Sequence, residues 1–285
     1  MHDQVTCPLC GNTSPTLDRH VILPKPYKRY SCGNCEGAFF IPRVPASTEY
    51  YQDFPEAAVE DRWEFRRASE AINRVQPSRH LDIGAGNGAF LSQLKVGHRI
   101  ALEPSTIPPI SPDAEDERIA DFGELGDLVD SANAFHVLEH VEVPRDFLKQ
   151  VRKALTSGGR LYMSFPNPSR IEASLYQDKY DLPPNHLNII SRAAAFSMLQ
   201  QAGFEVEEVM EEEINKSLFR LGSNQFYALI RKYFGPDLGD RLSKLRAFTV
   251  LKPVVFAPFI LNCALRISFA KRRVGDTVLY VAKAI

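Results

Sequence analysis

The chain has 285 residues, enough for one large domain and a small additional one. Its hydrophobic fraction of 44% is that of an ordinary globular protein, and its net charge of -1 gives no overall positive field, so we expect no nucleic-acid partner. The polar N-terminus does not resemble a secretory signal. Four of the five cysteines form two Cys-x-x-Cys pairs, which favours metal binding over disulfides and therefore a cytoplasmic location.

Residues 1–45 contain both cysteine pairs, Cys7 with Cys10 and Cys32 with Cys35. Four thiolates presented from two tight turns predict a closed tetrahedral zinc site, which is structural because it leaves no position open for a substrate. A redox dithiol would need a strand–helix–strand context that this segment lacks. We therefore predict a zinc ribbon whose stability depends largely on bound metal. Its expected strands are Val21–Leu23, Tyr27–Tyr30 and Ala38–Ile41.

Residues 46–76 are predicted to form a linker and a helix ahead of the main domain, which spans 77–285. Pro42 and Pro45 mark the start of the linker, and Pro55 opens a helix that we expect to reach Val75. The apolar candidates on this helix are Trp63, Phe65, Ala68 and Ile72.

The main domain begins with a strand at Arg79–Ile83, a glycine turn at 84–88 and an expected helix at Ala89–Lys95. Glycines in such a turn allow positive φ and close approach to a ligand, either a dinucleotide or S-adenosylmethionine. Asp82 would repel a pyrophosphate but suits the ammonium group of a methionine moiety. Glu103, after the strand Arg99–Leu102, is placed to accept hydrogen bonds from both ribose hydroxyls. The pattern therefore favours S-adenosylmethionine.

Strands and helices alternate through the rest of the domain. Ser191 is the expected N-cap of a helix at Arg192–Ala202, and Gly203 ends that helix. An insertion at 211–274 is mostly helical by pattern. We expect strands at Arg118–Ala120, Ser131–Phe135, Arg160–Phe165, Phe204–Met210 and Thr277–Ala284, and helices at Pro144–Leu155 and Arg192–Ala202.

Five sequence blocks occur in the order typical of one enzyme family: LDIGAGNGAF, ALEPS, FHVLEHV, LTSGGRLYMSFPNP and NHLNIISRAAAFSMLQQAGFEV. Over roughly residues 45–210 the chain resembles bacterial class I S-adenosylmethionine methyltransferases, which act on small molecules, quinone precursors, sugars and surface-glycan precursors. Some relatives also carry a zinc ribbon. The resemblance implies an α/β fold with a Rossmann-like doubly wound sheet and an antiparallel last strand. It implies cofactor contacts from Asp82, Gly84, Ala85, Gly86, Glu103, Asp121, Phe122 and Tyr51.

The segment His136–His140, HVLEH, is the candidate acceptor side. It matches the inverted zinc-peptidase motif, but it follows a core strand and Pro144 interrupts it, so we set that interpretation aside. Some methyltransferases that resemble this stretch carry E-x-x-E-H, which holds a divalent ion together with a later histidine. The matching positions are His136, Glu139, His140 and His186, and a histidine at the first position would favour zinc, manganese or iron over magnesium. Without metal, these side chains line the pocket near Asn167, and His140 or His186 is the expected general base.

The insertion contains Pro253–Leu265, 13 residues without a charge, between Lys252 and Arg266. A helix of that length spans ~20 Å, too little to cross a ~30 Å hydrocarbon core, and Pro258 would kink it. The segment therefore predicts peripheral contact at the inner membrane face, a lid helix buried over the acceptor pocket, or an interface between copies of the chain. Cys263 is expected to be a small core residue.

Together these features predict methyl transfer from S-adenosylmethionine to a small molecule or to a glycan or lipid-linked precursor, at oxygen. A sugar C-methyltransferase, an rRNA methyltransferase, a nicotinamide oxidoreductase and a non-catalytic assembly protein are the alternatives.

Overall fold

The computed structural model describes residues 5–18, 23, 25–47, 62–170, 173, 181–213, 218–234, 238, 246–269 and 274–285. The chain forms two compact units. The first combines Met1–Pro166, Pro183–Met210 and Thr277–Ile285, and the second combines Asn167–Leu182 and Glu211–Asp276.

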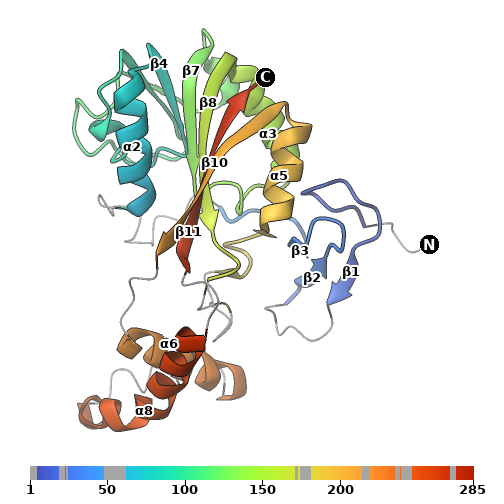
Figure 1. Cartoon of the computed structure of the whole chain (residues 1–285), viewed down its shortest axis with the longest axis vertical. Helices are drawn as coiled ribbons and strands as arrows, with labels where there is room; N and C mark the ends of the chain where they lie inside the picture. The colour runs from blue at the N-terminus through green and yellow to red at the C-terminus, as the bar shows by residue number, and fades with distance from the viewer. Residues whose placement is uncertain are drawn as a thin grey trace. The chain divides into compact units, whose positions relative to one another are not determined.

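A four-stranded antiparallel sheet contains the N-terminal segment (Figure 1), in the order β1 (Thr16–Asp18), β2 (Lys28–Ser31), β3 (Ala38–Ile41) and β9 (Asn188–Ile189). The last two predicted ribbon strands are confirmed. Of the predicted strand Val21–Leu23, the first two residues lie outside the described residues and Leu23 is not in a strand. The sequence did not predict β9, which the later part of the chain adds to the ribbon.

A seven-stranded sheet forms the centre of the first unit, in the order β10-β11-β8-β7-β4-β5-β6. Strands β4 to β8 pair in parallel, and β11 pairs antiparallel with β8, so the predicted sheet and its reversed last strand are confirmed. The bounds are β4 Arg79–Ile83, β5 His98–Leu102, β6 Glu117–Ile119, β7 Val129–Phe135, β8 Leu155–Pro166, β10 Phe204–Glu213 and β11 Val274–Ala284.

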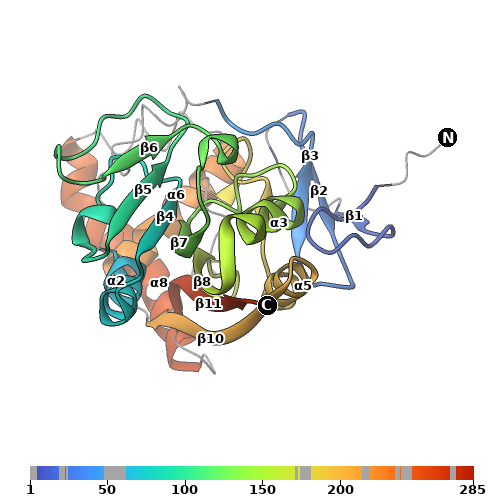
Figure 2. The same cartoon turned by 90° about the horizontal axis from the view of Figure 1, so that it is seen from above.

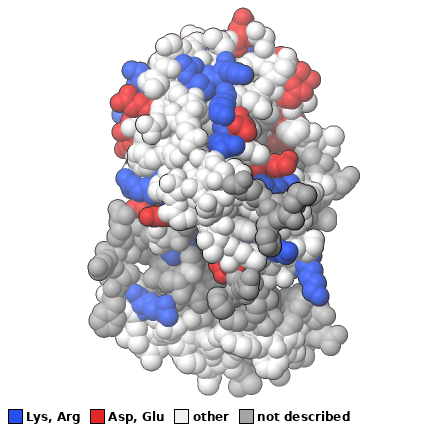
Figure 3. Space-filling view, turned by 90° about the vertical axis from the view of Figure 1, so that its right-hand side faces the viewer, with Lys and Arg blue, Asp and Glu red and all other residues white. Residues whose placement is uncertain are grey.

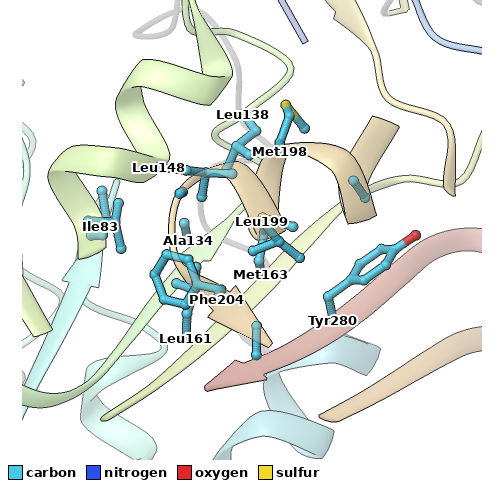
Figure 4. Packing of buried hydrophobic residues seen from close by; sticks show 14 of the residues in the cluster. Ile83, Ala134, Leu138, Leu148, Leu161, Met163, Met198, Leu199, Phe204 and Tyr280 are labelled. Carbon is cyan, nitrogen blue, oxygen red and sulfur yellow. The ribbon is translucent and has the colours of Figure 1, made fainter. Parts of the chain in front are cut away.

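Helices cover both faces of this sheet (Figures 1 and 2), with α2 (Trp63–Val75) on one face and α3 (Pro144–Ala154) and α5 (Arg192–Gln201) on the other. Because successive strand side chains point to opposite faces, the buried strand residues divide between two clusters. Leu81 and Ile83 belong to the cluster that also contains α3 and α5 residues, which Figure 4 shows from close by. The predicted apolar residues Phe65, Ala68 and Ile72 of α2 belong to the other cluster.

The helix ends follow local chemistry. Pro144 begins α3, and the Ser191 hydroxyl caps α5 by accepting a hydrogen bond from the Ala194 N–H over 2.9 Å, as predicted. Gly203 follows α5 with φ +86°. In contrast, α2 begins at Trp63 rather than at Pro55, because Arg62 has extended backbone angles (φ -97°, ψ 147°). Residues 48–61 lie outside the described residues.

The predicted helix Ala89–Lys95 is wrong. Only a 3-10 turn, η2 (Leu91–Gln93), is present. The Ser92 hydroxyl and the Gln93 side-chain amide both donate to the Ala89 carbonyl, over 2.9 and 3.2 Å, and thus compete with the backbone for this acceptor. A segment this short also provides few helical hydrogen bonds against the cost of nucleation.

In the second unit, α6 (Leu218–Phe234) packs against α8 (Arg246–Phe269), which confirms the helical character of the insertion. A Cβ on Gly222 would lie 2.8 Å from the backbone N of Ile260, so the glycine permits this close packing. Phe256 and Cys263 are buried, as expected for Cys263. Pro258 lies inside α8, which continues past it to Phe269. None of the helices in the described part of the chain is long and apolar enough to cross a membrane.

Candidate functional site

The four cysteines of the ribbon lie together. The Sγ atoms of Cys7 and Cys35 are 3.8 Å apart, and those of Cys10 and Cys32 are 3.6 Å apart. Four sulfurs bound tetrahedrally at about 2.3 Å from a zinc ion are about 3.8 Å from one another. All four Sγ atoms lie within 4.8 Å of one another, so the set is compatible with zinc. In the first turn Gly11 has positive φ, as expected for a glycine, but in the second the left-handed residue is Glu36 rather than Gly33.

The glycine turn after β4 has the backbone that the sequence predicts. Gly84, Gly86 and Gly88 all have positive φ, of +74°, +55° and +75°. A Cβ on Gly84 would lie 2.8 Å from the Cγ2 atom of Val137. The HVLEH segment therefore lies directly against the turn, because β4 and β7 are adjacent strands.

Glu103, at the end of β5, fixes one side of this turn. Its carboxylate accepts hydrogen bonds from the N–H groups of Gly86 and Ser105, over 2.8 and 2.9 Å. On the other side, the Arg118 guanidinium donates to the Gly86 carbonyl over 3.0 Å and pairs with Glu115. The sequence placed Glu103 here but offered no signal for Arg118, which the β5–β6 pairing brings into range.

Asp82 is buried at the end of a chain of polar side chains on one face of the sheet. The side-chain NH₂ of Asn133 donates to Asp82 Oδ1 over 2.5 Å. The side-chain oxygen of Asn133 therefore faces His80, and His80 Nε2 donates to this oxygen over 2.8 Å. The remaining ring nitrogen, Nδ1, accepts from the Ser131 hydroxyl over 2.7 Å. This assigns His80 as a neutral imidazole with its proton on Nε2.

Burial governs the pKa of both titratable groups in this chain of hydrogen bonds, Asp82 and His80. It raises the pKa of Asp82 to about 7, although the hydrogen bond from Asn133 opposes the shift. It lowers the pKa of His80 to about 4. A bound cation beside Asp82 would favour its ionised form.

Of the candidate adenine residues, Phe122 begins η3 (Phe122–Glu124), after β6, and Asp121 is the N-cap of η3. Asp121 is exposed, and its Oδ1 accepts from the Gly123 N–H over 2.6 Å. Phe122 packs edge-to-face on Phe147 of α3, with ring centroids 5.9 Å apart. Tyr51 lies outside the described residues.

His136, with φ +54°, is placed between two carboxylates. Its Nδ1 lies 3.1 Å from Glu139 Oε1, and its Nε2 lies 3.3 Å from Glu64 Oε1 on α2. Burial disfavours the charged ring, but the two carboxylates outweigh this and raise the pKa of His136 to about 10. The same contact lowers the pKa of Glu139 to about 2, against the effect of burial. These contacts tie the HVLEH segment to α2, and the charged ring that they favour would have no lone pair for a proton or a metal ion.

Glu139 also forms a cluster with His140 and His186, in which one ligand atom from each lies within 4.8 Å of the others. His140 Nδ1 donates to the Asn185 carbonyl over 2.7 Å, which leaves the lone pair of the neutral ring on Nε2. Burial lowers the pKa of His140 and so favours that neutral ring. The rings of His140 and His186 are nearly perpendicular, with centroids 4.8 Å apart. Among the described residues, no group hydrogen-bonds the buried Oε2 of Glu139.

Several residues of this site were missed from the sequence. Glu64 lies in the first turn of a helix, where an acidic residue has an ordinary explanation. The positions of Ser131 and Asn133 could have been predicted. These two residues alternate with Ala132 and Ala134 in a buried strand, so their polar side chains lie on the same face of the sheet, where each needs a hydrogen-bond partner. Asn167 belongs to the second unit, and its place near the histidines stays a prediction.

A seven-stranded sheet with a reversed last strand, a glycine turn after β4 and an acidic residue after β5 defines the class I S-adenosylmethionine methyltransferase fold. The profile of a family described as a methyltransferase domain matches residues 61–209, about half of the chain. The chain therefore belongs to this family and is an S-adenosylmethionine-dependent methyltransferase, which sets aside the nicotinamide oxidoreductase and the non-catalytic assembly protein.

Solved structures support the fold. The chain is 16% identical to a SAM-dependent methyltransferase from Thermotoga maritima, with a TM-score of 0.50, covering 84% of this chain and 97% of that one. It is also 16% identical to a chain in the complex between the Haloferax volcanii Trm112 methyltransferase activator and a methyltransferase, with a TM-score of 0.51, covering 85% and 99%. No curated protein sequence matches the chain.

Proposed function

We propose that this methyltransferase transfers the methyl group to a hydroxyl oxygen of a small molecule, or of a glycan or lipid-linked precursor. The observation that carries the proposal is the position of HVLEH, whose Val137 lies against Gly84 of the glycine turn. This contact puts the histidine-rich segment beside the residues expected to hold the methyl donor. The acceptor would then meet His140 and His186 next to the sulfonium.

The cofactor would bind along the ends of β4, β5 and β6. Asp82, Gly84, Ala85 and Gly86 would hold the methionine end, with the Asp82 carboxylate facing the ammonium group. Glu103 would accept from the ribose hydroxyls through the lone pairs that its backbone contacts leave unused. Asp121 and Phe122 would contact the adenine, and Tyr51 would close over the cofactor.

His140 is the proposed general base. Its Nδ1–H is fixed by the Asn185 carbonyl, so Nε2 is the atom that would accept the proton of an acceptor hydroxyl. Methyl transfer is an in-line displacement at an activated sulfonium, and the alignment of the two reactants supplies much of the rate. His186 would orient the acceptor across from His140, and His136 would act through its charge beside Glu139.

A divalent cation at this cluster is the second candidate, favoured by the buried Glu139 oxygen without a hydrogen-bond partner among the described residues. Glu139, His140 and His186 supply one carboxylate and two imidazoles, a donor set that suits zinc, manganese or iron. Such an ion lowers the pKa of an acceptor hydroxyl when it is bound. His140 Nε2 would then be a ligand rather than a base.

Variants of two residues separate these roles. We expect His140→Ala to reduce turnover more than it weakens S-adenosylhomocysteine binding, as measured by calorimetry. A selective loss of cofactor affinity would contradict the acceptor role. Chelator dialysis tests the cation: activity lost and restored by Mn²⁺, with the ribbon zinc retained, would favour it, and unchanged activity would exclude it. Glu139→Gln should abolish Mn²⁺ binding only if the cluster holds the ion.

The acceptor class is tested by supplying labelled S-adenosylmethionine with hydroxylated aromatics, sugar nucleotides and rRNA. Label on oxygen would support the proposal, and label on a sugar carbon would favour the C-methyltransferase alternative. Salt-sensitive RNA binding would favour the rRNA alternative. On the face that Figure 3 shows, basic and acidic side chains are interspersed among the described residues, which does not favour RNA.

Contact with an anionic membrane surface is proposed for α8. Val254, Leu261 and Leu265 are 73%, 61% and 50% exposed, and they recur at helical spacing between Lys252 and Arg266. Phe256 lies on the buried side of the same helix. We expect flotation with vesicles containing anionic lipid and its loss in Leu261→Glu; equal flotation of both proteins would contradict this contact.

A further inference from the structure

Arg43 lies between Pro42 and Pro45, two residues after the end of β3, where the sequence predicts that the ribbon passes into the linker. Its Nε donates to the Glu142 carbonyl over 2.6 Å, and its Nη2 donates to the Asn188 side-chain oxygen over 2.8 Å. Longer contacts of 3.4 Å join the same guanidinium to the carbonyls of Phe40, Val141 and Leu187. All of these acceptors are carbonyl oxygens, and they belong to three separate parts of the chain.

Two of those parts carry the acceptor-side histidines. The loop after β7 contains His140, and the segment before β9 contains His186. Their backbones are joined directly, because the N–H groups of Leu187 and Asn188 donate to the Glu139 carbonyl over 2.7 and 3.1 Å. The Asn188 amide also donates to the carbonyls of Leu138 and Val141, over 3.1 and 2.8 Å.

The third part is the ribbon itself. Phe39 pairs with Asn188 in the β3–β9 ladder, and the Phe40 N–H donates to the Leu187 carbonyl over 3.0 Å. The two cysteine turns are fastened to α5, since the Ser191 hydroxyl donates to the Cys35 carbonyl and the Gln201 amide donates to the Cys10 carbonyl. The ribbon is therefore a support for this loop pair rather than an independent appendage.

We propose that Arg43 is a positioning residue for the acceptor side: it locks the loop after β7 to the segment before β9, so that His140 and His186 keep their mutual geometry. A planar guanidinium presents donors in several directions at once, whereas a lysine ammonium is a compact point charge that does not reach all of these carbonyls. The proposal rests on the proposed acceptor role of the two histidines.

The experiment compares Arg43→Lys and Arg43→Ala in the full-length, zinc-loaded protein with bound S-adenosylhomocysteine. Arg29→Ala is the matched control, because Arg29 lies on β2 of the same ribbon with its Nε 3.8 Å from the Asp18 carboxylate. Three readouts are recorded: amide hydrogen exchange at Leu187 and Asn188, the imidazole carbon–proton resonances of His140 and His186, and S-adenosylhomocysteine affinity.

We expect both Arg43 variants to lose about tenfold in protection at Leu187 and Asn188 and to shift the two histidine resonances. Protection at Leu81 in β4 should stay as in the wild type, and S-adenosylhomocysteine affinity should change by less than about twofold. Added methylguanidinium should partly restore the signals of Arg43→Ala, and Arg29→Ala should behave as the wild type.

The proposal is overturned if Arg43→Lys keeps the wild-type protection and histidine resonances, or if Leu81 loses protection in parallel with Leu187. Should Arg43→Ala unfold or lose zinc, Arg43→Lys decides by the same readouts. None of these measurements needs methyl transfer. A failure of the proposed O-methylation can therefore be distinguished from a failure of the proposed role of Arg43.

Discussion

His80 should give the protein a measurable loss of stability in mild acid. The ring is fully buried, and its pKa is lowered from 6.5 to about 4, so the folded state resists a proton that the unfolded chain accepts. Between these two values the unfolded state binds more protons, and the free energy of unfolding therefore falls as pH falls. The stabilisation that the neutral His80 ring contributes is fully present above about pH 6.5. As pH falls below this value, the stabilisation decreases by ~1.4 kcal/mol per pH unit, which amounts to ~2 kcal/mol at pH 5.

Asp82, two hydrogen bonds away, acts in the opposite direction. Its pKa is raised from 3.8 to about 7, so its contribution increases stability as pH falls through this window. In the wild type, the free energy of unfolding as a function of pH therefore combines the opposing contributions of His80 and Asp82. A comparison of the wild type with His80→Gln isolates the contribution of His80, because the other titrating groups are common to both proteins.

The assay is urea unfolding of both proteins at pH 7, 6 and 5. His80→Gln should be less stable at pH 7, because the hydrogen bonds to Ser131 and Asn133 are altered, and the gap should narrow by ~2 kcal/mol at pH 5. Parallel curves for the two proteins would refute the assignment of His80 as a buried neutral ring.

Three further predictions concern the cofactor and zinc sites. Glu103→Gln should weaken S-adenosylhomocysteine binding about 10- to 100-fold by calorimetry, since a charged acceptor is lost; unchanged affinity would remove Glu103 from the ribose site. Gly84→Ala should lower the free energy of unfolding by ~2 kcal/mol or more, because the φ of +74° at Gly84 and its close contact with Val137, after β7, both oppose a Cβ. Gly126→Ala is its control, with no atom within 4 Å of the added carbon. Cys10→Ser should lower zinc content measured by mass spectrometry, whereas Cys263→Ala should retain it; equal zinc in both would count against the four-cysteine site.

The sequence by itself determined the sheet, the cysteine cluster and the glycine turn. These features are local or strongly periodic. Buried strands read as short apolar runs, and a positive-φ turn after a strand requires glycine. The spacing within each cysteine pair, Cys7 with Cys10 and Cys32 with Cys35, likewise predicts a metal-binding cluster without any long-range information. The prediction of a helix at Ala89–Lys95 failed although Phe90 and Leu91 are buried in the core. A segment this short follows its side-chain hydrogen bonds rather than its apolar pattern.

Only the tertiary structure decided how the acceptor side is held. Glu64, Arg43 and Asn188 are far apart in the sequence. Glu64 and Arg43 belong to no recognisable motif, and Asn188 lies in the block NHLNIISRAAAFSMLQQAGFEV, which does not indicate its partners. Long-range pairing brings each of them to the HVLEH segment: α2 places Glu64 on His136, and β9 joins the ribbon beside Glu139. Such contacts depend on how separate elements pack, and a periodicity or a spacing within one segment contains no record of them.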